Sequence, residues 1–199
     1  MAAQLPLVPR FVLGSTALCP FNEEAAHWFH RWFSDDELIA RMGDWDFFPM
    51  PYGDGDAAEY VKRVRKTTWL ICAEGAGEWR PIGYTGIYVK SRHRVGVFRI
   101  AVPEVAFRRQ GHAARATRLF NRWAFRHLDL HSLHLSVTAS NSAAISLYVR
   151  CGYVECGRYT GSRHEPDGRH DEVHMELLRS AWERTELEVA SDVSLVGAR

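Results

Sequence analysis

A short segment of the chain, RRQGHAARATRL from Arg108 to Leu119, combines one glycine with flanking arginines. The strand-like run before it ends at Val102, where Pro103 removes a backbone donor. Gly111 stands where a helix would begin, so the backbone can bend tightly and a ligand can approach with no Cβ in the way. The free N–H groups and the dipole of a first helical turn attract an anion. This strand–turn–helix therefore suits a diphosphate.

The local residues leave two other interpretations of this segment open. The first is a plain strand–helix connection with a solvated arginine face, since the G-K-[ST] of a P-loop and the further glycines of a dinucleotide fingerprint are absent. The second is a basic helix that binds nucleic acid, which would use Arg108, Arg109, Arg115 and Arg118. Against nucleic acid, the formal net charge is +1 and the same helix carries large apolar side chains for burial, namely Leu119, Phe120 and Trp123.

A second segment, NSAAISLYVRCGYVECG from Asn141 to Gly157, favours the diphosphate-binding turn over these alternatives. It resembles the N-x-x-A-I-x-L-Y-x-x-x-G-[F/Y]-x-x-x-G segment of the GCN5-related N-acetyltransferase (GNAT) family. The R-x-x-G-x-A pattern at Arg108 resembles the pyrophosphate motif of the same family, [Q/R]-x-x-G-x-[G/A]. The resemblance covers roughly residues 10–179. The ending DGRHDEVHMELLRSAWE is similar to the subgroup of ribosomal-protein N-terminal acetyltransferases and spermidine acetyltransferases.

The resemblance implies a fold of the α/β (α+β) class, with a mixed, mostly antiparallel sheet, helices on both faces and a V-shaped slot for acetyl-CoA. A β-bulge in the strand Arg99 to Val102, and splaying of this strand from LHLSV, would open the slot. The backbone near Ile100, Ala101 and Val102 would hold the pantetheine and the acetyl carbonyl. The implied contacts to the rest of the cofactor come from Arg108, Arg109, Gln110, Gly111, His112, Ala113, Ala114, Asn141 and Ala144.

Two residues of the second motif have an ordinary role beside the implied one. Asn141 is a good helix N-cap, and the resemblance adds a hydrogen bond to the pantetheine. Tyr148 is the implied catalytic residue, because a hydroxyl near the sulfur can protonate the leaving thiolate. The alternative for Tyr148 is a core tyrosine that packs with Ile145 and Cys151.

No general base is evident in the sequence. Many family members carry a glutamate on the strand before the turn, and by its offset from Pro103 that place falls near Gly96. Glycine cannot accept a proton, which leaves Glu104, Asp46 or an ordered water as candidates. An amine can also arrive already neutral.

The acceptor side is expected over an acidic run between Ser34 and Glu59, which holds eight acidic residues against one base. Carboxylates beside aromatic rings suit a cationic amine by charge and by cation–π contact. The alternative is a series of helix caps, since acidic residues are favoured at helix starts. A polyamine, an aminoglycoside and a peptide N-terminus all remain open as acceptors. The expected acceptor residues are Asp44, Trp45, Asp46 and Phe48.

We expect no metal site. His170 and His174 share a strand face but lie about 13 Å apart by strand rise, so the late histidines are interpreted as solvated strand and loop residues. The four cysteines form no C-x-x-C, which indicates neither zinc nor a disulfide framework. Cys151 and Cys156 are expected in the core rather than in catalysis.

Hydrophobic periodicity predicts the elements that position these residues. It indicates a first strand over 10–20, a helix from Asn22 to Phe33, and short helices from Ser34 and from Asp56. Gly152 should end the helix that begins after Asn141. The expected later strands cover 67–75, 81–90, 95–102, 133–137, 153–159 and 171–178, with one helix from about Gly111 to Leu128.

Length and composition complete the expectations. A chain of 199 residues with 46% hydrophobic residues favours one domain. We expect the acetyltransferase domain over 10–179, an N-terminal extension over 1–9, and a helical turn with a loose tail over 180–199. No signal peptide or membrane span is predicted, so a cytoplasmic location is expected. Analogy with the family suggests a homodimer through the late strands. A catalytically silent acyl-CoA-binding module is the main alternative function.

Overall fold

The computed structural model describes residues 7–22, 25–33, 59, 61–165, 167–189 and 194–195. The α-helices are α1 (Ala25–Phe33), α4 (His112–His127), α5 (Ser142–Arg150) and α6 (Arg179–Val189). The strands are β1 (Phe11–Leu13), β2 (Thr16–Pro20), β3 (Thr68–Gly75), β4 (Glu78–Lys90), β5 (Val95–Ala101), β6 (Ser132–Thr138), β7 (Val154–Glu165), β8 (Gly168–Leu178) and β9 (Ser194–Leu195). None of these helices is long and apolar enough to cross a membrane.

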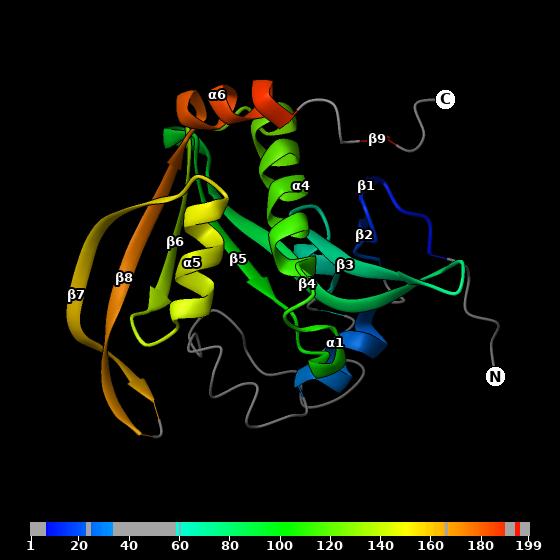
Figure 1. Cartoon of the computed structure of the whole chain (residues 1–199), viewed down its shortest axis with the longest axis horizontal. Helices are drawn as coiled ribbons and strands as arrows, with labels where there is room; N and C mark the ends of the chain where they lie inside the picture. The colour runs from blue at the N-terminus through cyan, green and yellow to red at the C-terminus, as the bar shows by residue number, and fades with distance from the viewer. Residues whose placement is uncertain are drawn as a thin grey trace.

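The described strands form one sheet in the order β7-β8-β6-β5-β4-β3-β2-β1-β9. Neighbouring strands run antiparallel except β5 and β6, which are parallel and joined by α4. In Figure 1, α4 and α5 lie against one face of the sheet and α1 lies on the other side. The mixed, mostly antiparallel sheet with helices on both faces is therefore confirmed. We call its two surfaces the α4 face and the α1 face.

Two details near the ends of the chain differ from the expectations. The single strand predicted over 10–20 is a hairpin, because Gly14 adopts a φ of +54° and lets β1 fold back on β2. The helical turn expected after Arg179 is a helix of 11 residues. The predicted helix from Ser34 lies outside the described residues, as does the start of the helix predicted from Asp56.

Strand alternation divides the core between the two faces. On the α4 face, apolar side chains of β6 and β8 are buried beneath α4 and α5, as their period of two predicted: Leu133, Leu135, Val137, Val173, Met175 and Leu177. On the α1 face, Phe29 and Trp32 pack on Tyr84, with ring centroids 5.4 and 6.4 Å away. The sheet is therefore held from both sides, and the residue parity along each strand decides which face a side chain reaches.

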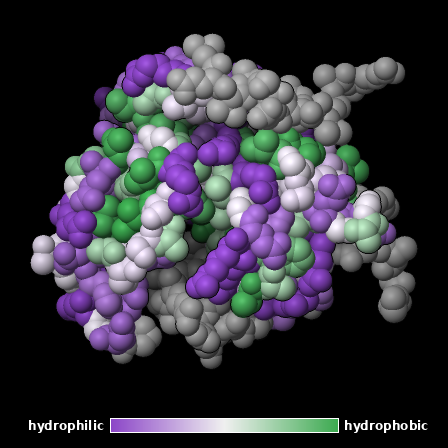
Figure 2. Space-filling view, in the orientation of Figure 1, coloured by the Kyte–Doolittle hydropathy of each residue, from purple (hydrophilic) through white to green (hydrophobic). Residues whose placement is uncertain are grey.

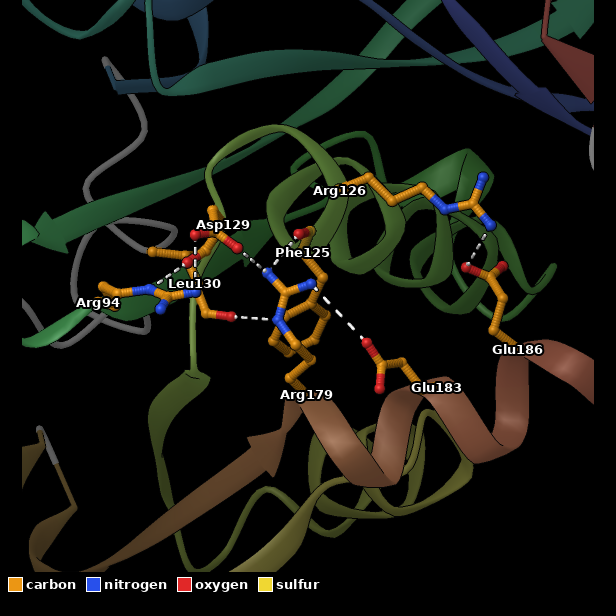
Figure 3. A network of polar contacts seen from close by, with 8 residues as sticks. All are labelled: Arg94, Phe125, Arg126, Asp129, Leu130, Arg179, Glu183 and Glu186. Carbon is orange, nitrogen blue, oxygen red and sulfur yellow. Dashed lines mark hydrogen bonds and ion pairs between the residues drawn. The ribbon is translucent and has the colours of Figure 1, made fainter.

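Arg179, the first residue of α6, fastens one end of the fold (Figure 3). Its guanidinium donates to the carbonyl oxygens of Leu130 and Phe125 at 2.8 and 2.7 Å, and to the carboxylate of Asp129 at 3.0 Å. The other carboxylate oxygen of Asp129 lies 2.7 Å from Arg94, at the turn before β5. This cluster, which we call the Arg179 clamp, ties α6 to the C-terminus of α4 and to the starts of β5 and β6.

We expect Arg179→Ala to lower the free energy of unfolding by about 2 kcal/mol, because two carbonyls lose a charged donor. The melting temperature should fall by roughly 4–8 °C for a chain of this size. Arg184→Ala, at an exposed position of the same helix, is the matched control and should change little. Equal melting temperatures for the two variants would show that the clamp does not contribute.

Candidate active site

The central opening of the sheet lies between β5 and β6. These strands pair over three rungs, from Val95 opposite Ser132 to Val97 opposite His134. Beyond that point β5 stays paired with β4, and β6 stays paired with β8. Residues 98–101 therefore separate from residues 135–138 and leave a V-shaped gap between the two strands, as the resemblance implied. The backbone of Ile100 and Ala101 borders this gap.

The bulge expected in β5 is not present, because the register between β4 and β5 runs without a shift from Lys90–Val95 to Tyr84–Ala101. The shift falls instead between β3 and β4, next to Ile71 and Cys72. A close approach fixes the end of β5, since a Cβ on Gly83 would lie 2.2 Å from the carbonyl oxygen of Ala101. The V arises from strands that keep different partners.

The N-terminus of α4 lies at the open end of the V (Figure 1). Gly111 is the N-cap with a φ of +79°, and no side chain of the described residues caps the helix there. The first backbone bond into the helix runs from the Arg115 N–H to the Gly111 carbonyl. The preceding amides of Gly111 to Ala114 are those that a helix leaves for a ligand. The predicted strand–turn–helix with Gly111 at its start is therefore present, and binding of an anion by its amides stays a prediction.

Arg115 fastens this turn to the neighbouring strand β2 and to the residue before Gly111. Its Nε donates to Thr16 Oγ1 at 2.7 Å and one Nη to the Gln110 carbonyl at 3.0 Å. The first contact ties α4 to β2, and the second ties the helix to the turn before it. Arg115 therefore takes part in packing and is not one of a set of solvated arginines.

His112 contributes its backbone rather than its side chain. The buried imidazole lies 2.8 Å from Thr16 Oγ1, on the β2 side of the helix. Burial, followed by the charge of Arg115, lowers the pKa of His112, so the ring is neutral at pH 7. A neutral, inward-facing ring adds no charge to the anion site.

Arg108 and Arg109 have different surroundings. The guanidinium of Arg108 donates to the carbonyls of Val102 and Pro103, both at 3.0 Å, and so braces the end of β5. Arg109 is exposed and has a positive φ of 60° at the turn. Gln110 donates its side-chain amide to the Ala106 carbonyl at 2.6 Å. Of these predicted cofactor residues, Arg109 has the side chain best placed to meet a phosphate in solvent.

The second motif forms α5, which faces the same opening. Asn141 is the N-cap, and its Oδ1 accepts from the Ala144 N–H at 3.1 Å, so the capping role is confirmed. Its side-chain amide keeps its donors for another partner. Gly152 ends the helix in the left-handed region with a φ of +90°, as predicted.

Tyr148 lies on the inner side of α5. Its ring centroid is 6.4 Å from that of Phe98 on β5 and 5.9 Å from that of Tyr153. The residue is 8% exposed. Burial, followed by the nearby Cys151, raises the pKa of Tyr148 to about 12. The phenol therefore stays protonated at neutral pH, and it lies against the first residue of β5 beyond the last rung.

Glu104 is the candidate base that the structure describes, and it is engaged in packing. Its carboxylate accepts from Trp32 Nε1 at 3.0 Å and lies 3.4 and 3.6 Å from Arg80 and Arg31. Its side chain is 11% exposed. These contacts fasten α1 to the segment after β5, so Glu104 acts as an anchor. The acceptor residues Asp44, Trp45, Asp46 and Phe48 lie outside the described residues.

The late histidines separate into two environments. His170 lies 2.8 Å from Asp167 at the β7–β8 hairpin, and the ligand atoms of this pair and of Glu165 fall within 4.8 Å of one another. His174 packs against Tyr159 in the sheet, with centroids 4.3 Å apart. Cys151 is buried, as expected, whereas Cys156 is exposed, so its assignment to the core was wrong.

A cavity of about 300 Å³ lies away from the V, between α4, α5 and α6. Three arginines reach its lining, namely Arg118, Arg122 and Arg150, together with Glu186. Figure 2 shows hydrophilic side chains gathered over α4 on this face of the molecule. Arg122 is paired with Glu186 at 3.4 Å. The arginines of the helix therefore divide between packing, pairing and this cavity rather than forming one basic stripe.

Comparison with known proteins agrees with this geometry. The model of the acetyltransferase (GNAT) domain matches residues 16–154. No curated protein matches the chain significantly. The spermidine N-acetyltransferase of Vibrio cholerae, solved with CoA and spermine, is similar with a TM-score of 0.71 and 20% identity over 85% of this chain and 98% of that one. A GNAT-family acetyltransferase of Bacillus anthracis gives a TM-score of 0.69 and 12% identity over 85% and 98%.

The domain match covers well over half of the chain, so the protein belongs to the GNAT acetyltransferase family. It is an N-acetyltransferase, and the acetyl donor of this family is acetyl-CoA. The described residues fit that donor: the V offers free strand edges, α4 offers uncapped amides at Gly111, and α5 begins with Asn141 at the same opening.

The conformation at Gly111 should control binding of the donor. We expect Gly111→Ala to raise the KM for acetyl-CoA about tenfold, because alanine is strained at this φ and its Cβ would lie 3.0 Å from an Nη of Arg115. Gly77→Ala is a matched control: its φ is +80°, its Cβ meets nothing within 4 Å, and it lies in the β3–β4 turn. An unchanged KM in the Gly111 variant would contradict the backbone cradle.

Proposed function

We propose that this enzyme transfers the acetyl group of acetyl-CoA to the primary amine of a small cationic molecule of the polyamine or aminoglycoside type. The observation that carries the proposal is the V between β5 and β6, with the N-termini of α4 and α5 at its open end. Acetyl transfer to a peptide N-terminus is the second candidate, because the sequence also resembles ribosomal-protein N-terminal acetyltransferases. We propose residues 10–179 as the catalytic unit.

The backbone would bind the donor in this proposal. Bound acetyl-CoA supplies a thioester whose carbonyl carbon accepts an amine and whose sulfur leaves. The backbone of Ile100 and Ala101 at the free edge of β5, and of Val102 just after it, pairs with the pantetheine arm, and an N–H there polarises the carbonyl. The amides of Arg109 to Ala114 bind the pyrophosphate. Arg109 adds charge at the mouth, and Asn141 donates to the arm.

Tyr148 is the proposed general acid. A leaving thiolate takes a proton most readily from a donor that is neutral at the working pH. Because burial raises the pKa of Tyr148 to about 12, its hydroxyl is fully protonated there. Its contact with Phe98 holds it at the start of the V. Ala144 lies one helical turn before it and lines the same side of α5.

The proposed acceptor class rests on charge and on the similar structures. The run from Ser34 to Glu59 carries eight acidic residues with Trp45 and Phe48 among them, which suits a cationic amine. One of the similar structures holds spermine beside CoA. Both points favour a polyamine over a neutral amine.

Tyr148→Phe tests the acid. We expect kcat to fall about 100-fold, because one positioned proton donor is lost, while the KM for acetyl-CoA stays within about twofold. In the wild type, the raised pKa means that no alkaline limb due to Tyr148 should arise below about pH 10. Tyr153→Phe, which removes a buried hydroxyl bonded to Asn121, is the control and should lower stability with little effect on kcat. Equal kcat in the Tyr148 variant would exclude the role.

An amine panel tests the acceptor class. Thiol release from acetyl-CoA should be fastest with spermidine or an aminoglycoside and slower with a neutral amine.

Reversal of Asp44 and Asp46 to lysine should raise the KM for the best amine about tenfold and leave the KM for acetyl-CoA unchanged. The double reversal of Glu74 and Glu78 to lysine, at exposed positions of β3 and β4 on either side of their turn, is the control with the same change of net charge. CoA binding without release for any amine would identify the silent module instead. Salt-dependent DNA binding without CoA binding would identify the nucleic-acid binder.

A further inference from the structure

The place where a family glutamate was expected cannot hold a side chain. A Cβ on Gly96 would lie 2.1 Å from Ile87 Cδ1 and 3.0 Å from Leu130 Cδ1. A side chain at position 96 would enter the core of the α4 face between Ile87 and Leu130, and it would not face an incoming amine. The next residue, Val97, points to the α1 face and is apolar. The two neighbouring strands place Tyr88 of β4 and His134 of β6 beside Val97, and of these two side chains imidazole is the usual general base.

The neighbour of Val97 across the last rung is His134 of β6. Leu133 and Leu135 are buried on the α4 face, so alternation places the imidazole of His134 on the α1 face. It thus stands at the vertex, where β5 and β6 begin to separate. Its side chain is 42% exposed, so solvent or a ligand can reach the ring.

Polar groups on two strands surround this imidazole. Nε2 lies 3.0 Å from Ser132 Oγ on the same strand. The carboxylate of Glu176, opposite on β8, lies 3.9 Å away and is 30% exposed. On the same face, His174 is the next titratable group on β8, Arg99 lies two residues beyond Val97 on β5, and Tyr88 of β4 is paired with Val97. The hydroxyl and the carboxylate are polar neighbours that fix the orientation of the ring.

The α1 face is the side of the sheet from which we expect the acceptor amine to approach the thioester. On the α4 face, Tyr148 packs against Phe98, and the first turns of α4 and α5 cover the opening. The proposed thioester site begins at Ile100, three residues beyond Val97, which is about 10 Å along the strand. An imidazole and one or two bridging waters span that distance. An amine that arrives from the α1 face therefore meets the acetyl carbon on the same side as His134.

We propose that His134 accepts, through bridging water, the proton that the acceptor nitrogen loses, and that Glu176 beside it helps to keep the ring in position. This inference rests on the proposed acetyl transfer. The nitrogen forms a bond to the acetyl carbon, the carbon–sulfur bond breaks, the N–H proton passes to the ring, and the hydroxyl proton of Tyr148 passes to the sulfur. His134 then releases its proton to solvent and Tyr148 regains one, so no other reactant is needed.

His134→Gln tests the inference by thiol release across a range of pH, with the best amine of the panel. We expect kcat at pH 7 to fall at least tenfold, with the KM for acetyl-CoA within about twofold. The pH profile of kcat/KM should differ in shape from that of the wild type. His131→Gln, an exposed histidine just before β6, is the control and should behave as the wild type. Glu176→Gln should give a smaller loss than His134→Gln.

A second variant separates catalysis from folding. Free imidazole should restore part of kcat to His134→Ala, but should not change the control. Wild-type kcat and an unchanged pH profile in His134→Gln would overturn the inference, as would absence of rescue in a folded His134→Ala. Failure of the proposed function would look different, because the wild type itself would then release no thiol with any amine.

Discussion

The separation of β5 from β6 is the constraint on which the site depends. Two parallel strands stay together for three rungs and then part, because each keeps its outer neighbour along its whole length. The closed end is fastened just before the first rung, where the His131 N–H donates to the Arg94 carbonyl and Asp129 bridges Arg94 and Arg179. The Arg179 clamp thus fixes one end of the V. Buried backbone N–H and C=O groups that lack hydrogen bonds are costly. The open end of the V therefore favours a ligand whose own amide groups can pair with the free strand edges.

The helices that follow β5 and β6 convert this gap into a binding site. Each strand is followed by a helix whose N-terminus returns to the open end (Figure 1). The turn before α4 is stiff, since Arg108 holds the end of β5 and Arg115 holds the start of the helix against β2. The arginines that looked like a phosphate grip in the sequence therefore act mainly on the protein's own carbonyls. The backbone amides are left for the anion, and a preorganised donor set costs little to bind.

Local patterns predicted most of the fold, and long-range contacts account for what they missed. Alternation identified β6 and β8, and the cap at Asn141 with the stop at Gly152 bounded α5. The role of Arg115 was hidden because its partner Thr16 is 99 residues away. The predicted bulge failed because β5 obtains its separation from its neighbours' pairing rather than from its own register. The local sequence around His134 did not indicate a catalytic role. The proposed role depends on the position of His134 opposite Val97, and that register exists only in the folded sheet.

Strand parity also separates the two proton-transfer groups. Adjacent residues of β5 point to opposite faces, so Phe98 supports Tyr148 on the α4 face while Val97 stands beside His134 on the α1 face. The phenol is buried, which keeps its proton at neutral pH, whereas the imidazole is half exposed beside a carboxylate. An acid and a base in direct contact would hydrogen-bond to each other instead of to the reacting atoms. With the sheet between them, the proton can leave the amine on one face and reach the sulfur from the other.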